Sequence, residues 1–401
     1  MIESDQESMK TSAAAQTLAA SSADGISRSD ASALILAEDV ELEELLTAAG
    51  RIRQQRTGSV ITYSRKVFIP LTNLCRDICA YCTFVRTPDD PQARTMTPEE
   101  VLTVAEAGRR AGCKEALFSL GERPEVRYPA YREWLEDRGY GSTIKYLAAM
   151  CKLVFERSGL IPHANPGTMN AEEIATLRPF SPSMGMMLES TSMRLLRRGE
   201  AHHGCPDKVP AARLSTLEAA GEAGVPFTTG ILIGIGETPE ERLDALFAIR
   251  EIHRRFGHIQ EVIVQNFRAK SDTRFASWPE PGQKDLIRTA AVARLIFGTE
   301  INIQIPPNLT PSGYGALLRS GINDWGGISP VTLDHINPER AWPEIATLKQ
   351  VTEYAGFELR ERLSVYPEYL LKNRPPVGAQ VLERMLTLTD EQGMVHRREE
   401  R

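Results

Sequence analysis

The chain has 401 residues, a formal net charge of −6, 42% hydrophobic residues and 25% charged residues, proportions typical of a globular protein with a sizeable core. The charge argues against nucleic acid or an anionic membrane as the main partner, and no apolar run approaches the roughly 20 residues of a membrane span. The N-terminus carries acidic residues early and lacks the basic and apolar regions of a secretory signal. A cytoplasmic location is therefore expected.

The first 55 residues are predicted to form an extension before the main domain. Residues 1–28 are rich in Ser, Ala, Asp, Glu and Gln and have almost no large apolar side chains, which predicts disorder. Helical periodicity follows from Ser29 to Gln55, with Ser29 or Asp30 as the N-cap and Gly50 as the helix stop.

From residue 61 onward, short apolar runs alternate with helical patterns. The apolar runs predict strands at 67–72, 115–120, 160–164, 183–188, 227–233, 261–266 and 301–305. Helices are predicted at 97–112, 142–157, 170 onward, 210–223, 238–256 and 284–297. At least six such β–α repeats predict an α/β fold with a parallel sheet. A (β/α) barrel, partial or complete, is favoured over an open doubly wound sheet.

The predicted barrel domain covers residues 56–340, between the N-terminal extension 1–55 and a C-terminal extension 341–401. The C-terminal extension is predicted to be helical, with an amphipathic tail at 358–362 and a charged, frayed end.

Polar or glycine-rich clusters follow nearly every predicted strand, at 75–82, 121–122, 165–167, 189–190, 234–237, 266–268 and 306–308. Enzymes with this barrel build their active sites from the loops at the C-terminal ends of the strands. The clusters therefore predict one shared site. The alternative is that they are ordinary polar loops without a functional role, which are common in α/β proteins.

Three of the six cysteines, Cys75, Cys79 and Cys82, fall within eight residues. Thiolates are soft ligands suited to iron–sulfur clusters, zinc or copper(I). A [4Fe–4S] cluster normally takes four cysteines, and no fourth lies nearby in the sequence, so one metal position would stay open for a ligand. A zinc or redox-thiol loop is the alternative. The scattered Cys113, Cys151 and Cys205 are expected to be free thiols.

The spacing Cys75-x3-Cys79-x2-Cys82 after a first strand, with Tyr81 before the third cysteine, resembles the signature of the radical S-adenosylmethionine (radical SAM) enzymes. The resemblance implies a [4Fe–4S] cluster on these three cysteines, with its open iron chelated by the amino and carboxylate groups of S-adenosylmethionine. Reductive cleavage of that cofactor then gives a 5′-deoxyadenosyl radical. A low-potential electron donor such as ferredoxin or flavodoxin is also implied.

Other strand-end residues match cofactor-contacting positions of that superfamily. Gly121 and Glu122 resemble the motif that holds the methionine amino group, and an ammonium group needs such acceptors. The remaining positions implied by the resemblance are Glu189 and Ser190 for the ribose and methionine, Arg197 (or Arg198) for the methionine carboxylate, and Gly234 and Glu237, after Gly230 and Leu232, beside the adenine. Each could instead be a surface side chain or a loop residue.

The segment His202-His203-Gly204-Cys205 contains residue types that bind metals. Adjacent histidine side chains diverge, however, and no second pair stands nearby. A polar loop is therefore the favoured interpretation.

Within the superfamily, several motifs together resemble one family: Asn73–Phe84, Leu120–Glu125, His163–Thr168, Met184–Ser190, Val264–Lys270 and Gly321–Gly327. It is the radical SAM subunit (subunit 1) of the synthase for 7,8-didemethyl-8-hydroxy-5-deazariboflavin, the chromophore FO of coenzyme F420 biosynthesis. The resemblance runs from about residue 60 to 370.

This family closes the deazaflavin ring. The resemblance implies that 5-amino-5-(4-hydroxybenzyl)-6-(D-ribitylimino)-5,6-dihydrouracil and S-adenosylmethionine give FO, 5′-deoxyadenosine, methionine and ammonium. A partner, FO synthase subunit 2, makes this adduct from tyrosine. The chain carries one cluster motif, so the second activity is expected on a separate protein.

A ribityl chain and a uracil require several hydrogen-bonding groups in a mostly apolar pocket. The candidates at strand ends are Asn165, Gln265, Asn266, Arg268, Asn308, Asn323, Asp324 and His335, with Trp325 to stack on a ring. About half are expected to be loop caps or otherwise satisfied polar groups, and no catalytic acid or base is identified.

Two alternatives to this function remain. The first is a neighbouring radical SAM enzyme, such as the menaquinone-pathway cyclase or the tyrosine-using subunit 2 itself. The second is a non-enzymatic iron–sulfur scaffold or sensor. The segments Asn323–Gly327 and Glu122–Glu125 favour subunit 1 over the first, and the set of cofactor motifs argues against the second.

Overall fold

The computed structural model describes residues 18, 23–36, 42–311, 313–372 and 374–397. Within them, eight parallel strands close into a barrel, because β1 pairs with β8 on one side and with β2 on the other. The barrel strands are β1 (Val60–Pro70), β2 (Glu115–Ser119), β3 (Ile161–Asn165), β4 (Ser183–Gly185), β5 (Phe227–Ile233), β6 (Ile259–Asn266), β7 (Asn302–Gln304) and β8 (Asp324–Ile328). The predicted (β/α) barrel is confirmed, and it is complete.

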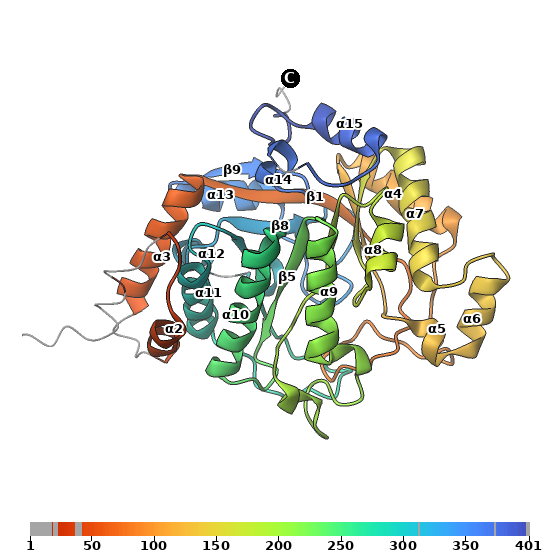
Figure 1. Cartoon of the computed structure of the whole chain (residues 1–401), viewed down its shortest axis with the longest axis horizontal. Helices are drawn as coiled ribbons and strands as arrows, with labels where there is room; N and C mark the ends of the chain where they lie inside the picture. Colours follow the sequence, from red (N-terminus) through yellow and green to blue (C-terminus); the bar gives the residue numbers. More distant parts are fainter. Residues whose placement is uncertain (1–17, 19–22, 37–41, 312, 373, 398–401) are drawn as a thin grey trace, which may run out of the picture.

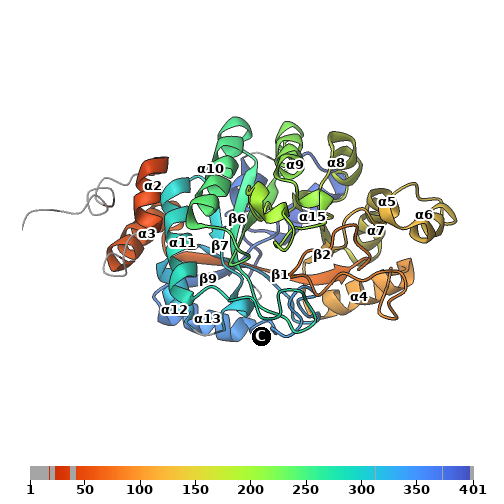
Figure 2. The same cartoon turned by 90° about the horizontal axis from the view of Figure 1, so that it is seen from below.

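Helices surround the strands in both views (Figures 1 and 2). Those that follow β1 are α4 (Pro98–Arg110), α5 (Pro124–Arg127), α6 (Pro129–Glu136), α7 (Thr143–Ser158), α8 (Ala171–Leu177), α9 (Pro210–Glu222), α10 (Pro239–Phe256), α11 (Gln283–Phe297), α12 (Tyr314–Arg319), α13 (Ile345–Tyr354), α14 (Pro367–Leu371) and α15 (Ala379–Leu388). Capping explains several starts: Thr97, Asn170 and Thr238 each form a reciprocal capping box with a glutamate three residues on.

The N-terminal segment packs against the barrel helices. Its helices α2 (Arg28–Ile35) and α3 (Leu42–Thr57) both contact α11, beside which they lie in Figure 2. The N-cap of α2 is Ser27, not Ser29 or Asp30. Gly50 lies inside α3 rather than ending it, because a buried apolar face outweighs the roughly 1 kcal/mol helix cost of one glycine. Of the stretch predicted to be disordered, residues 1–17 and 19–22 lie outside the described residues.

A ninth strand lies outside the closed barrel. The predicted amphipathic tail at 358–362 is instead β9 (Glu358–Glu361), which pairs in parallel with Val60–Tyr63 of β1. The prediction failed because β1 extends past its barrel neighbours. The N–H and C=O groups along its unpaired edge can form hydrogen bonds with a short extended segment, whatever the sequence pattern of that segment. The chain after β9 then turns into the lower end of the barrel.

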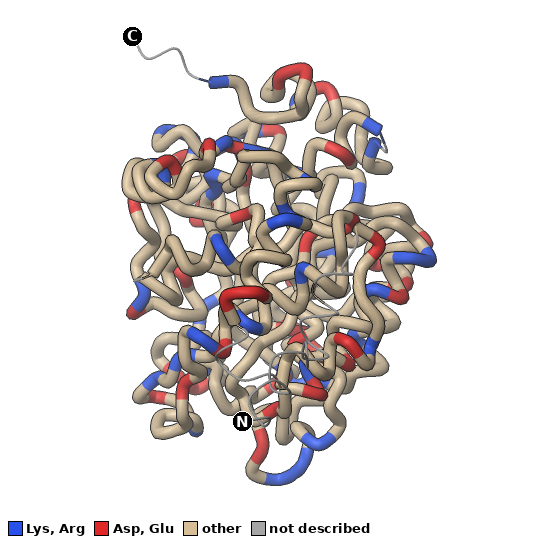
Figure 3. Tube along the Cα trace, turned by 90° about the vertical axis from the view of Figure 1, so that its left-hand side faces the viewer, with Lys and Arg blue, Asp and Glu red and all other residues tan. Residues whose placement is uncertain are grey.

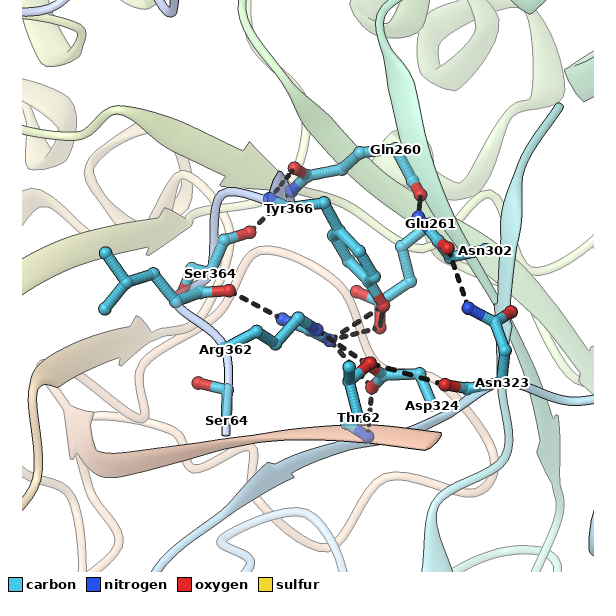
Figure 4. Close-up of polar contacts among 12 residues, drawn as sticks. Thr62, Ser64, Gln260, Glu261, Asn302, Asn323, Asp324, Arg362, Ser364 and Tyr366 are labelled. Carbon is cyan, nitrogen blue, oxygen red and sulfur yellow. Dashed lines mark hydrogen bonds and ion pairs between the residues drawn. The ribbon is translucent and has the colours of Figure 1, made fainter. Parts of the chain in front are cut away.

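That lower end is closed by a buried ionic network around Arg362 (Figure 4). The Arg362 guanidinium bonds both carboxylate oxygens of Asp324, at 2.6 and 2.7 Å, and Glu261 Oε1 at 3.0 Å. The Tyr366 hydroxyl donates to Glu261 Oε1 at 2.9 Å, and the guanidinium carbon lies 3.8 Å from the Tyr366 ring centroid. All four residues are buried. We call this group, Glu261, Asp324, Arg362 and Tyr366, the barrel floor.

Charges outside the barrel are mixed in sign. Figure 3 shows acidic and basic residues interspersed along the trace on the side that it presents. In the described part of the chain, no helix combines the length and the apolar character needed to cross a membrane.

Candidate active site

A cavity of about 330 Å³ occupies the barrel lumen. Its walls run from the cysteine loop at the C-terminal ends of the strands down to Arg362. All of the barrel strands contribute to its lining, β4 and β8 only through the glycines Gly185 and Gly327. The end with the cysteine loop, at the C-terminal ends of the strands, is the end at which such folds place their active sites.

Cys75, Cys79 and Cys82 all line the upper part of this cavity. The backbone N–H of Glu122 donates to Cys75 Sγ at 3.1 Å. A Cβ on Gly121 would lie 1.9 Å from the Leu74 carbonyl oxygen, so only glycine lets the end of β2 approach the cysteine loop this closely. Three soft thiol ligands with N–H donation to one of them fit an iron–sulfur cluster.

A fourth cysteine, which the sequence placed far away, lies beside these three. Cys205, in the segment between β4 and α9, has its Sγ 3.7 Å from Cys79 Sγ. Hydrogen-bond donation from the Cys205 thiol lowers the pKa of Cys79. The expectation that no fourth cysteine is near the site is therefore wrong in space, although it holds along the chain.

The His202–Cys205 segment covers the cysteine loop. His202 Nε2 lies 3.1 Å from the Tyr81 hydroxyl, and the Ala80 N–H donates to the Ala201 carbonyl at 2.8 Å. Among the described residues, the group of His, Cys, Asp or Glu side chains with metal-binding proximity is Asp77, Glu122 and Asp207, not the two histidines. The interpretation of this segment as a polar loop agrees with these contacts.

We expect the cluster-free protein to form a Cys79–Cys205 disulfide when treated with oxidised glutathione. The two thiols lose two protons and two electrons, and glutathione disulfide is reduced to two thiols, a reaction favoured by the lowered pKa of Cys79. Peptide mapping by mass spectrometry should find this crosslink, and iron uptake should then require a thiol reductant. The Cys205→Ser variant should take up iron without reductant. Absence of the crosslink from the oxidised wild-type protein would contradict the prediction.

Buried charged groups surround the cysteines. Arg213 Nη1 lies 3.3 Å from Glu122 Oε2, and Lys208 Nζ lies 2.8 Å from Glu189 Oε1. All four side chains line the cavity. Sequence reasoning missed Lys208 and Arg213, which belong to no motif. The structure explains Arg213, since the buried Glu122 carboxylate requires a cation or several donors.

Asp77, two residues after Cys75, is also buried against this cavity. Burial, and then the nearby Glu122 carboxylate, raise its pKa to about 6. One carboxylate oxygen, Oδ2, has no hydrogen-bond partner in the described part of the chain. An orphaned buried acceptor beside the cysteine loop fits a cationic ligand group, such as an amino group.

Four of the predicted cofactor contacts, Tyr81, Gly121, Glu122 and Glu189, line the cavity. Arg197 does not: Arg197 and Arg198 are both exposed and outside the lining. They follow a 3₁₀ turn at Met193–Leu196. The carboxylate contact of Arg197 stays a prediction, and the cations that line the cavity near the cysteines are Arg213 and Lys208.

The remaining predicted contacts, Ser190, Gly234 and Glu237, also lie outside the lining. The Ser190 hydroxyl accepts from the Ser192 N–H at 3.1 Å. The Glu237 carboxylate accepts from the Gly234 N–H at 2.8 Å and pairs with Arg242 at 2.7 Å. The Ser190 and Glu237 side chains hold the turns after β4 and β5. Of the motif that runs from Gly230 to Glu237, Leu232 on β5 lines the cavity.

The predicted substrate residues divide into two groups. Those that line the cavity are Asn165, Gln265, Asn266, Arg268 and His335. Asn308, Asn323, Asp324 and Trp325 do not line it.

The second group makes hydrogen bonds to other protein groups, so its substrate contacts stay predictions. Asn308 donates to Asp334 at 2.9 Å, and Asn323 accepts from Arg294 at 2.6 Å. Asp324 belongs to the barrel floor, and Trp325 Nε1 donates to Thr352 Oγ1 at 3.1 Å behind β8.

Two aromatic rings in the cavity wall were not predicted. Phe68 on β1 and Trp342, from the segment before α13, stack with ring centroids 5.1 Å apart and an interplanar angle of 8°. Both line the cavity. They offer an apolar, flat surface that suits an aromatic ligand group.

Comparison with known proteins places this site in context. Residues 69–249 match the family model described as "Radical SAM superfamily". The chain is 50% identical to the 7,8-didemethyl-8-hydroxy-5-deazariboflavin synthase of Methanopyrus kandleri over 83% of this chain and 99% of that protein. It is 50% identical to the FO synthase of Streptomyces avermitilis over 92% of this chain but only 44% of that protein. The chain thus spans less than half the length of such FO synthases.

A solved structure agrees on the fold. The FeFe-hydrogenase maturase HydG from Carboxydothermus hydrogenoformans superposes with a TM-score of 0.70, covering 92% of this chain and 86% of that one at 19% identity.

Proposed function

The chain belongs to the radical SAM superfamily and, within it, to the 7,8-didemethyl-8-hydroxy-5-deazariboflavin (FO) synthases, and from this membership we propose that it closes the deazaflavin ring of FO. The substrate is 5-amino-5-(4-hydroxybenzyl)-6-(D-ribitylimino)-5,6-dihydrouracil. With S-adenosylmethionine it gives FO, 5′-deoxyadenosine, methionine and ammonium. The observation that carries the proposal is the cysteine loop, which opens onto a cavity with both an aromatic wall and free polar groups.

The cofactors of this reaction are a [4Fe–4S] cluster and S-adenosylmethionine. Cys75, Cys79 and Cys82 would hold the cluster, whose bound cofactor supplies the radical that starts ring closure. Asp77 and Glu122 offer carboxylates to the amino group of methionine, and Arg213 and Lys208 offer cations to its carboxylate. The barrel walls shield the reacting groups from water.

Because the chain matches 99% of the 7,8-didemethyl-8-hydroxy-5-deazariboflavin synthase of Methanopyrus kandleri, we assign it the ring-closing half-reaction. A partner, FO synthase subunit 2, supplies the adduct from tyrosine. A low-potential donor such as ferredoxin or flavodoxin supplies the electron.

The Arg213→Gln variant is expected to bind S-adenosylmethionine about 10–100-fold more weakly, the effect of losing a hydrogen bond from a charged group. Arg213 is buried beside Glu122 in the cavity wall. The matched control is Arg197→Gln, because Arg197 is exposed outside the lining. Isothermal titration with the reconstituted protein measures both affinities. An unchanged affinity in Arg213→Gln, or a loss in Arg197→Gln alone, would return the carboxylate contact to the loop after β4.

One assay tests the whole proposal. The protein is reconstituted with iron and sulfide under anaerobic conditions and supplied with S-adenosylmethionine, a reductant and the adduct. FO is fluorescent, so its formation is followed directly, and 5′-deoxyadenosine is measured alongside. Cleavage of S-adenosylmethionine without FO would indicate a neighbouring radical SAM activity. A protein that takes up no iron would refute the cofactor assignment.

A further inference from the structure

The lower half of the cavity is lined by polar side chains whose hydrogen bonds to the described residues are incomplete. In most barrels of this type, branched aliphatic side chains fill this space. Here Lys66 on β1, His163 on β3 and Gln304 on β7 face the lumen, and each is buried from bulk solvent. Together they form a ring of polar groups, which we call the lower ring, just above the barrel floor.

The hydrogen bonds of the lower ring are incomplete. Lys66 Nζ donates to Ser364 Oγ at 3.2 Å, and within the described residues no second acceptor lies within hydrogen-bonding range of this ammonium group. His163 uses Nδ1, 2.7 Å from Ser183 Oγ, while its Nε2 and the Gln304 amide make no hydrogen bond to any described residue. Buried polar groups are normally paired. These groups therefore point to a polar ligand.

Glycines make the room for these side chains. A Cβ on Gly327 would lie 2.8 Å from Lys66 Cδ, and a Cβ on Gly326 would lie 2.0 Å from Gln304 Nε2. Any larger residue at either position would push these side chains out of place. The two glycines of the Trp-Gly-Gly segment in β8 thus leave room in the lumen for the side chains of Lys66 and Gln304. The tryptophan of this segment does not line the cavity.

At the upper rim of the cavity, several polar groups pair with one another. Arg268 pairs with Glu280 at 2.6 Å and donates to the Leu309 carbonyl. Asn337 donates to Asp334 at 2.9 Å. The wall between rim and lower ring carries the stacked Phe68 and Trp342.

This distribution assigns an orientation to an elongated ligand that is aromatic at one end and polyhydroxylated at the other. We propose that the ribityl chain of the substrate lies in the lower ring, hydrogen-bonded to Lys66, His163 and Gln304, with the uracil and hydroxybenzyl groups facing the cysteine loop. This inference rests on the proposed function. Hydroxyl groups both donate and accept, which matches a ring that contains an ammonium, an imidazole and an amide.

The test compares two fluorescent ligands on the reconstituted enzyme: FO itself, and the same chromophore with an ethyl group in place of the ribityl chain. Anaerobic fluorescence anisotropy measures both affinities. We expect the wild-type enzyme to bind FO at least about tenfold more tightly than the ethyl analogue. The Lys66→Met and Gln304→Leu variants should each lose most of this preference while keeping their affinity for the ethyl analogue within about twofold. Lys145→Met, at an exposed lysine on α7, is the matched control and should behave as wild type.

Equal affinities of the wild-type enzyme for the two ligands would overturn the inference, and this comparison requires no variant to fold. An unchanged preference for FO in both folded variants would also overturn it, as would an equal loss of affinity for both ligands. Conversion of the adduct to FO is measured on the same wild-type preparation. Failure of that conversion refutes the proposed function instead, so the two failures are distinguishable.

Discussion

The Cys82→Ala variant is expected to lose its iron and to cleave no S-adenosylmethionine. Cys82 lines the top of the cavity with Cys75 and Cys79, and a cluster held by three protein thiolates cannot tolerate the loss of one. Mutation of residues that only hydrogen-bond to metal ligands already costs about 10–100-fold in metal affinity or activity. The loss of activity on removing a ligand itself should therefore exceed about 100-fold. Iron content, visible absorption and 5′-deoxyadenosine formation after anaerobic reconstitution measure the effect.

The matched control is Cys151→Ala. Cys151 is fully buried in α7, away from the cavity lining, so its loss tests the general effect of removing a core thiol. This variant should bind iron and turn over as wild type. If Cys82→Ala kept a full cluster and normal cleavage, the cluster would have to be held by other residues, and Cys205 would be the next candidate.

The sequence sufficed for most of the barrel because each of β1 to β7 overlaps a short apolar run that alternates with helical patterns. It did not predict β8, whose Asp-Trp-Gly-Gly-Ile sequence has low strand propensity. Its strand conformation is stabilised by hydrogen bonds to β1 and β7, between which it lies. Likewise, β9 has a mixed, half-buried sequence and becomes a strand only because β1 offers it an edge.

The site residues also fall into those that the sequence predicted and those that it did not. The three clustered cysteines were predictable, because their spacing is local. Cys205, Lys208 and Arg213 were not, because they reach the cysteine loop only when the chain after β4 folds back over it. A sequence also does not tell whether a polar residue at a strand end faces a ligand or another protein group. Asn323 and Asp324 proved to be of the second kind.

The barrel lumen contains both kinds of polar residue, those bonded to other protein groups and those that can bind a ligand. The barrel floor and the lower ring are neighbours, and both are buried and polar. In the floor, every charge has a partner, so it stabilises the fold and closes the barrel. In the lower ring, partners are missing, so it is available to a ligand. The closed floor also gives the lower ring a fixed base, because Ser364, the partner of Lys66, lies two residues after Arg362.

The Arg362→Ala variant is accordingly expected to be strongly destabilised, by about 3–5 kcal/mol in its free energy of unfolding, because it leaves two buried carboxylates without their cation. Arg362 and Asp324 are essentially inaccessible to solvent, at 2% and 0% exposure of their side chains. The matched control is Arg319→Ala, whose partner Glu43 is exposed, and it should cost less than about 1 kcal/mol. Chemical denaturation followed by circular dichroism measures both.

A second variant tests whether the stranded charge causes this loss. Combining Arg362→Met with Asp324→Asn keeps much of the side-chain volume and removes one of the stranded carboxylates, so it should be more stable than Arg362→Met alone. If the double variant were the less stable of the two, the Asp324 carboxylate would stabilise the fold through its bonds to Thr62 and Gly326 rather than through Arg362. If Arg362→Ala unfolded like the Arg319→Ala control, the floor carboxylates would not depend on Arg362, and Arg362 would not be what closes the barrel.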